Sequence, residues 1–103
     1  MKRAIKVKWI EALRSRKYRQ GKGCLLWSGG YCCLGVLCHV VDPKMKFWEP
    51  SSGKLPRKIA TMCSCKCDPS VVVASSGVRT TLSLLNDEGT SFKKIANLIE
   101  EQL

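Results

Sequence analysis

The sequence has few acidic residues, a single histidine and no long apolar run. Its longest mostly apolar stretch, residues 31–41, contains Gly35 and His39 and is far shorter than the ~20 residues that a membrane-spanning helix needs. Residues 1–18 are basic and include no continuous apolar stretch, so we expect no secretory signal. We therefore expect a protein that is neither secreted nor inserted in a membrane and that acts in the cytoplasm.

The scarcity of histidine also limits the catalysis that can be predicted. Cys38 directly precedes His39, and consecutive residues of a helix point about 100° apart, so the two do not form a Cys–His nucleophilic pair. Short glycine motifs at residues 21–23 and 29–30 precede predicted strands, whereas nucleotide-binding glycine loops follow a strand and open a helix. The sequence thus predicts a protein that is not an enzyme.

Charge is distributed unevenly along the chain. Acidic residues number 8 against 18 basic residues, which gives a formal net charge of +10. Residues 1–22 carry +8, residues 23–67 carry +4 and residues 68–103 carry −2. Such a basic half indicates an anionic partner, namely nucleic acid, an acidic protein surface or a phosphorylated ligand. The alternative is that an exposed helix uses lysine and arginine for solubility alone.

Cysteine is abundant, with 7 in 103 residues. Because no export signal is expected, reduced thiols in the cytosol are the better prediction. A free cysteine packs as a small apolar residue. This role is predicted for Cys24, Cys32, Cys33 and Cys38.

The first half of the chain predicts a helix, a hairpin and a second helix. An amphipathic helix over residues 3–17 is indicated by apolar residues at helical spacing along one face. Two short β-prone runs, 24–27 and 31–33, flank the three-residue link Ser28-Gly29-Gly30 and predict a hairpin. Residues 34–41 are apolar nearly all round and predict a buried helix that ends before Pro43, with a continuing strand as the alternative.

The second half predicts an irregular, variable middle segment, residues 42–80, followed by a pair of helices. Two helical turns over 55–62 and a short third strand at 71–73 interrupt this middle segment. A short helix is predicted over 79–86 and a final helix after Thr90 or Ser91. The final helix ends with Glu100 and Glu101, which oppose phosphate, so we interpret the pair as packing helices rather than a DNA-reading motif.

These elements predict the α+β class and one domain spanning residues 1–103. Its architecture is an N-terminal helix, a β-hairpin with a third short strand as an option, a buried helix and a C-terminal helix pair. The hairpin needs helices against its apolar face, because two strands alone are marginally stable.

One stretch of the middle segment interleaves aromatic residues with cations. That mixture suits phosphate contact combined with stacking on an unpaired base. The alternative is that the aromatic side chains cover the small core, or anchor a protein partner, while the cations stay solvated. The residues concerned are Lys44, Lys46, Phe47, Trp48, Lys54, Arg57 and Lys58.

The pattern Cys63-x-Cys65-x-Cys67 is the candidate metal site. Three thiolates with Cys38 or His39 as a fourth ligand would match the tetrahedral preference of zinc. Structural zinc sites, however, use pairs of ligands two to four residues apart, usually two such pairs. We therefore expect no cofactor, with zinc as the alternative.

Both ends of the chain resemble a family of small bacteriophage and prophage proteins. The resemblance covers residues 8–41 and 82–102, and its motifs are WIEALRS at 9–15, YRQGKG at 18–23, YCCLGVLC at 31–38 and LNDEGTSF at 85–92. It implies a phage-encoded accessory protein acting inside a bacterial cell, and it transfers no catalytic or binding residues.

Three hypotheses of function follow. The first is a protein that docks on a host macromolecule, such as a component of a defence system, and blocks it sterically. The second is a nucleic-acid-binding accessory protein that uses the basic residues of 1–22 and 44–58. The third is sequestration of a small phosphorylated signal in a pocket between protomers. The sequence favours a host protein as the partner and leaves the oligomeric state open.

Overall fold

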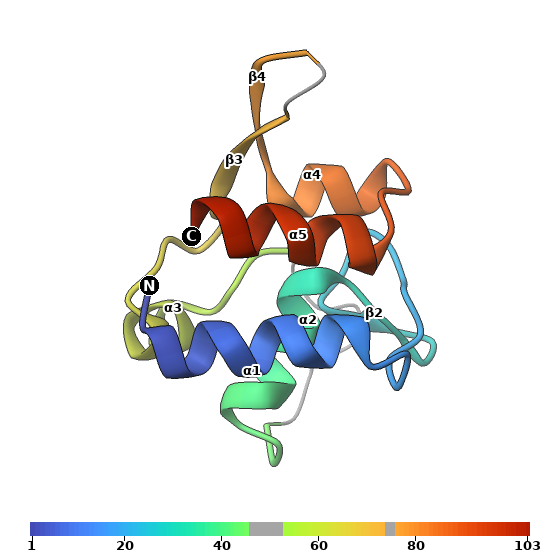
Figure 1. Cartoon of the computed structure of the whole chain (residues 1–103). Coiled ribbons are helices and arrows are strands. Elements are labelled where there is room, and N and C mark those ends of the chain that lie inside the picture. Colours follow the sequence, from blue (N-terminus) through green and yellow to red (C-terminus); the bar gives the residue numbers. More distant parts are fainter. Residues whose placement is uncertain (46–52, 74–75) are drawn as a thin grey trace.

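The computed structural model describes residues 1–45, 53–73 and 76–103. Its elements follow one another along the chain, and Figure 1 shows two small hairpins attached to a group of packed helices. In chain order they are α1 (Arg3–Arg14), β1 (Leu26–Trp27), β2 (Gly30–Tyr31), α2 (Cys33–Val41), α3 (Arg57–Cys63), β3 (Ser70–Val73), β4 (Val78–Thr81), α4 (Leu82–Asp87) and α5 (Phe92–Gln102). The predicted α+β class is confirmed. None of the helices among the described residues is long and apolar enough to cross a membrane.

Helix α1 buries one face through Trp9, Ile10 and Leu13. The indole Nε1 of Trp9 donates to the carbonyl of Cys33 at 2.9 Å, which fixes α1 against α2. The helix ends at Arg14, three residues before the predicted limit of 17. Arg16 stops it, because this residue has a φ of 63° in the left-handed region and cannot continue a right-handed helix.

The predicted hairpin forms, with a shorter turn than expected. Trp27 pairs with Gly30, so the link is the two residues Ser28 and Gly29. Both have positive φ, 50° and 79°, as the common two-residue hairpin turn requires. The segment after α1 lies along β2, since the amide of Gly21 donates to the carbonyl of Tyr31 at 2.7 Å.

Helix α2 is the buried helix that the sequence predicts, and it packs against α1 and α4. Leu34, Val36 and Leu37 are fully buried, and so are the flanking thiols of Cys33 and Cys38. The Sγ of Cys32 caps its first turn by accepting from the amide of Gly35 at 3.3 Å. The predicted packing role is confirmed for three of the four cysteines, while Cys24 is half-buried.

The middle segment contains more regular structure than predicted. Helix α3 and strand β3 match the expected helical turns and third strand. The prediction of a helix beginning at 79 is wrong, because residues 78–81 form strand β4 against β3, from Val73↔Val78 to Ser70↔Thr81. Thr81 ends the strand and caps α4, its Oγ1 accepting from the amide of Leu84 at 3.4 Å.

Helix α5 begins as predicted, with the Oγ of Ser91 accepting from the amide of Lys94 at 3.3 Å. Its buried face is the predicted one, formed by Phe92, Ile95, Ala96 and Ile99. Figure 1 shows α5 antiparallel to α1, with both termini at the same end of the helix pair. The end of α1 therefore lies beside the beginning of α5, and this neighbourhood positions the candidate site.

Candidate functional site

The basic charge of the protein is not neutralised within the fold. The pair Arg14–Glu100, at 2.9 Å, is the one ion pair that joins two described residues. Other carboxylates accept from neutral donors, as Asp87 does from the amide of Gly23 at 2.8 Å and Asp68 from the amide of Ser83 at 3.2 Å. The surface thus keeps most of its positive charge available to an outside partner.

Outside the helices, the densest run of cations is residues 16–22, which we call the cationic loop. Four of its seven residues are basic and exposed: Arg16, Lys17, Arg19 and Lys22. The loop joins α1 to the β1–β2 hairpin. The backbone carbonyl of Arg19 accepts a hydrogen bond from the amide of Tyr31 at 2.7 Å. These backbone bonds fix the loop to the hairpin, so its cations project from an ordered backbone.

Asn86 holds the cationic loop from the inside. This side chain is fully buried, and its Nδ2 donates to the carbonyl of Gly21 at 2.7 Å. Its Oδ1 accepts from the side-chain amide of Gln20 at 2.9 Å and from the amide of Cys33 at 3.2 Å. One residue of α4 therefore ties the loop to the first turn of α2.

An aromatic cluster supports the loop from its other side. The Tyr18 hydroxyl and Nδ1 of His39 are 2.6 Å apart and hydrogen-bonded, and the Tyr18 and Tyr31 rings meet edge to face with centroids 5.1 Å apart. Burial, and then the neighbouring Tyr31, raise the pKa of the Tyr18 hydroxyl, so it stays neutral. His39 is thereby part of a structural cluster. The nearby Trp27, at the tip of the hairpin, is 50% exposed.

Of the basic and aromatic residues predicted from the middle segment, the structure describes the four cations Lys44, Lys54, Arg57 and Lys58. Lys46, Phe47 and Trp48 fall outside the described residues. Lys44 follows the end of α2, and Arg57 and Lys58 lie in the first turn of α3, all exposed. The residue just before Lys54 lies close to the end of the cationic loop, since a Cβ added to Gly53 would lie 3.2 Å from the carbonyl oxygen of Gly23, the residue after the loop. The Lys54 region is therefore near the end of the loop.

The candidate metal ligands do not form a metal-binding group among the described residues. The thiols of Cys63 and Cys65 hydrogen-bond to each other, and burial is the main cause that raises the pKa of Cys63 to about 11 and also raises that of Cys65. His39 is bonded instead to Tyr18. In the part of the chain that the structure describes, no group of three or more His, Cys, Asp or Glu side chains could bind one metal ion.

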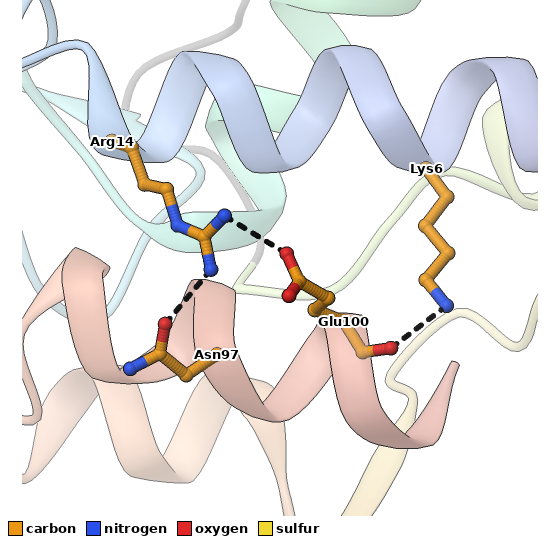
Figure 2. A network of polar contacts seen from close by, with 4 residues as sticks. All are labelled: Lys6, Arg14, Asn97 and Glu100. Atoms are coloured by element: carbon orange, nitrogen blue, oxygen red, sulfur yellow. Dashed lines mark hydrogen bonds and ion pairs between the residues drawn. The ribbon is translucent and has the colours of Figure 1, made fainter.

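Two concave surfaces lie between α1 and α5, on either side of Arg14. Figure 2 shows the polar contacts that join the two helices here. The guanidinium of Arg14 donates to Glu100 at 2.9 Å and to the side-chain oxygen of Asn97 at 2.8 Å, while the Lys6 ammonium donates to the backbone carbonyl of Glu100 at 3.2 Å. Towards the termini lies a groove of about 620 Å³, lined by Met1, Arg3, Lys6, Val7, Ile10, Glu11, Arg14, Glu100 and Leu103. Towards the cationic loop lies a cleft of about 560 Å³, which we call the Arg16 cleft, lined by Leu13, Arg14, Arg16, Tyr18, Gln20, Ser91, Phe92 and Lys93.

The charge of the cationic loop could be predicted from the sequence, but the cleft could not. Arg16 and Lys93 are far apart in the chain, and only the antiparallel packing of α1 on α5 makes them neighbours. A local signal was present in Arg16 itself, because this residue occupies the position after a helix where glycine is usual.

Comparisons with known proteins identify a family and no function. No curated protein and no solved structure matches the chain. A family model described as "Domain of unknown function (DUF8296)" matches residues 1–103. Because the match spans the entire chain, the protein belongs to the family of the domain of unknown function DUF8296.

Proposed function

We propose that this protein is a non-enzymatic nucleic-acid-binding accessory protein that contacts the phosphate backbone through the cationic loop. The observation that carries the proposal is the gathering of four exposed cations on a loop whose backbone is fixed at both Gly21 and Arg19. Because the backbone of the loop is already fixed, binding orders little additional backbone, and each phosphate contact releases a condensed counterion.

The hairpin beside the loop supplies the second element that such binding needs. Trp27 lies on β1, which pairs with β2, and β2 in turn bonds to the cationic loop. Its indole is 50% exposed, so a face is open to stack on an unpaired base. Each such stack contributes about 1–3 kcal/mol and depends little on sequence. This arrangement favours single-stranded over double-stranded nucleic acid.

The exposed apolar residues that the structure describes give less support to docking on a host protein. A protein interface usually has a central cluster of buried aromatic and apolar anchors. Within residues 1–45, 53–73 and 76–103, the large exposed apolar side chains lie instead on different elements, namely Val7 on α1, Trp27 on β1, Met62 on α3, Val78 on β4 and Leu84 on α4. Charge is therefore the stronger guide to the partner.

The biological setting of this proposal comes from the sequence resemblance. The motifs at residues 9–15, 18–23, 31–38 and 85–92 support an accessory role encoded by a phage or prophage and carried out in the cytoplasm of a bacterial cell. Protection, masking or delivery of a nucleic acid requires binding without chemistry, which agrees with the absence of a predicted catalytic pair.

The test is a titration against single- and double-stranded oligonucleotides of matched length at several salt concentrations. We expect binding to the single strand at low salt that weakens as salt rises, with a slope of log K against log salt near −0.7 for each phosphate contacted. The variant Lys17→Ser/Arg19→Ser removes two loop cations and should weaken binding and lower the slope by about 1–2.

A matched control separates local contact from net charge. Lys66→Ser/Arg79→Ser removes the same two charges from a different surface, near the termini, where both side chains line one shallow hollow with Met1 and Leu103. We expect this control to bind almost as well as the wild type. Equal losses in both variants, or no oligonucleotide binding at low salt, would overturn the proposal, and the second result would favour a protein partner.

A further inference from the structure

The Arg16 cleft has the size and position of a small-molecule site. Its volume of about 560 Å³ lies within the range of about 300–1,000 Å³ that ligand pockets usually have. Helix α1 ends on one side of it and helix α5 begins on the other, while Tyr18 and Gln20 of the cationic loop close a third side. Three separate segments therefore converge on one concave surface.

The described residues that line the cleft carry charge of one sign. They include Arg14, Arg16 and Lys93 and no acidic side chain. The neighbouring groove differs, because its lining includes both Glu11 and Glu100. Arg14 is partly neutralised by Glu100, whereas Arg16 and Lys93 form no side-chain hydrogen bond or ion pair with another described residue. These two cations are therefore the ones available to an anion in the cleft.

The remaining wall can recognise a base. Tyr18 and Phe92 contribute rings, and Leu13 contributes apolar surface. Both amide hydrogens of Gln20 are in use, because Nε2 donates to Asn86 at 2.9 Å and to the carbonyl of Thr90 at 2.7 Å. Its Oε1 has no partner in the described part of the chain, and because Gln20 lines the cleft this acceptor is available to a ligand there.

From this combination we infer that the Arg16 cleft binds a nucleoside 5′-phosphate whose base has an exocyclic amino group. Arg16 and Lys93 contact the phosphate, the base lies against Tyr18, and the amino group donates to Oε1 of Gln20. Adenine, cytosine and guanine carry such an amino group, whereas uracil and thymine carry none. The inference deepens the proposed nucleic-acid binding and rests on it, since the same chemistry occurs in a free mononucleotide and at the phosphorylated 5′ end of a strand.

The backbone of Arg16 supports a role for its side chain. Its φ of 63° is a conformation in which a residue with a Cβ is less stable than glycine. An arginine at this position gives up stability that a glycine would supply. Arg16 is exposed and lines the cleft, so its side chain is available to contact a phosphate there.

The experiment measures binding of AMP, UMP and adenosine by calorimetry or by NMR titration of the full chain. We expect AMP to bind, UMP to bind at least about tenfold more weakly because Oε1 then faces an acceptor, and adenosine to bind more weakly still because it lacks the phosphate. A second arm compares an adenine-terminated single strand with and without a 5′-phosphate, and we expect the phosphate to strengthen binding about tenfold.

Matched variants on one helical turn identify the site. Lys93→Gln removes a cation that lines the cleft and should weaken the binding of AMP about tenfold. Lys94→Gln removes a cation that is also exposed but does not line the cleft, and it should have little effect on AMP binding. Equal effects of the two variants, or AMP and adenosine binding alike, would overturn the inference.

The outcomes separate the inference from the proposed function. Oligonucleotide binding that is indifferent to both the 5′-phosphate and Lys93→Gln, together with no binding of AMP, would refute the cleft and leave the cationic loop as the nucleic-acid interface. Binding of AMP without any binding of oligonucleotides would support the cleft as a site for a free nucleotide and refute the proposed function.

Discussion

The side-chain Nδ2 of Asn86 donates to the backbone carbonyl of Gly21 at 2.7 Å, across 65 residues of sequence. Asn86 is the buried polar side chain of the described core, and its Oδ1 serves two further donors, on Gln20 and on Cys33. The motifs at 18–23, 31–38 and 85–92 therefore meet at one side chain. Asn86 therefore joins three segments that are far apart in the sequence and holds them in one packed arrangement.

Replacing Asn86 by alanine should destabilise the fold by about 2–4 kcal/mol, because it leaves the buried Cys33 amide and the part-buried Gly21 carbonyl without this partner. Urea unfolding followed by circular dichroism measures the loss. The control is Asn97→Ala, whose side chain is exposed and accepts only from Arg14, and which should change stability by less than about 1 kcal/mol. Similar losses for both variants would contradict the central role of Asn86.

Replacing Gly35 by alanine should prevent normal packing of α2. An added Cβ would lie 1.9 Å from the carbonyl oxygen of Leu25, a backbone atom that cannot rotate away. Alanine is otherwise favoured over glycine within a helix by about 1 kcal/mol, so a loss of about 3 kcal/mol or more would report the collision. In the control Gly77→Ala, the added Cβ would enter open space, and the φ of 66° is the one source of strain. This variant should lose about 1–2 kcal/mol. Thermal unfolding of the two variants checks the difference.

Stability should fall at alkaline pH because of the buried thiols. Burial is the main cause that raises the pKa of Cys32 to about 11 and that of Cys38 to about 12, from an ordinary value of 9.0. The folded state therefore retains protons that the unfolded state loses, so this contribution is complete below pH ~9 and disappears as pH rises through about 12. For Cys38 it amounts to at most about 4 kcal/mol. Urea unfolding from pH 8 to 11 should give a falling free energy, and the slope should flatten in Cys38→Ala.

The seven thiols should divide into two groups towards an alkylating reagent. Cys32, Cys33, Cys38 and Cys63 are buried, whereas Cys24, Cys65 and Cys67 are half-buried. At neutral pH the native protein should react at the second group and be protected at the first, because only unfolding exposes the buried thiols as reactive thiolates. Peptide mass spectrometry after a timed reaction, with and without denaturant, measures each site. Rapid native labelling of Cys33 or Cys38 would contradict the packing of α2.

Local signals in the sequence were sufficient to predict the helices. The cap at Ser91 and the apolar spacing after it predicted α5, and the continuous apolar run predicted α2. The start of the predicted helix at 79 failed because Val78–Thr81 has a partner in β3, and pairing of β-branched residues across a hairpin outweighed helical spacing.

The candidate site was less accessible to sequence reasoning. The charge of the cationic loop was visible, but its attachment to β2 and Asn86 depends on contacts between distant segments. The Arg16 cleft required the antiparallel packing of α1 on α5, which no local pattern specifies. Residues 46–48, singled out from the sequence, lie outside the described residues, so their predicted role stays a prediction.

The substitution Arg16→Gly should make the protein more stable and a weaker binder. Glycine adopts a φ of 63° without steric cost, so we expect a gain of about 0.5–1 kcal/mol in the free energy of unfolding. The same change removes a cation from the cleft and should weaken the binding of AMP about tenfold. Urea unfolding and calorimetry on the same samples measure the two effects.

Arg16→Ala separates the two causes in that experiment. It keeps the strained backbone and removes only the charged group, so it should bind AMP as weakly as Arg16→Gly without gaining its stability. If both variants bound AMP like the wild type, the guanidinium would have no part in the cleft. If Arg16→Gly were no more stable than Arg16→Ala, the left-handed backbone would not be the cost that the side chain imposes. If Arg16→Gly, but not Arg16→Ala, combined a gain in stability with a loss of affinity for AMP, Arg16 would favour binding at the expense of stability.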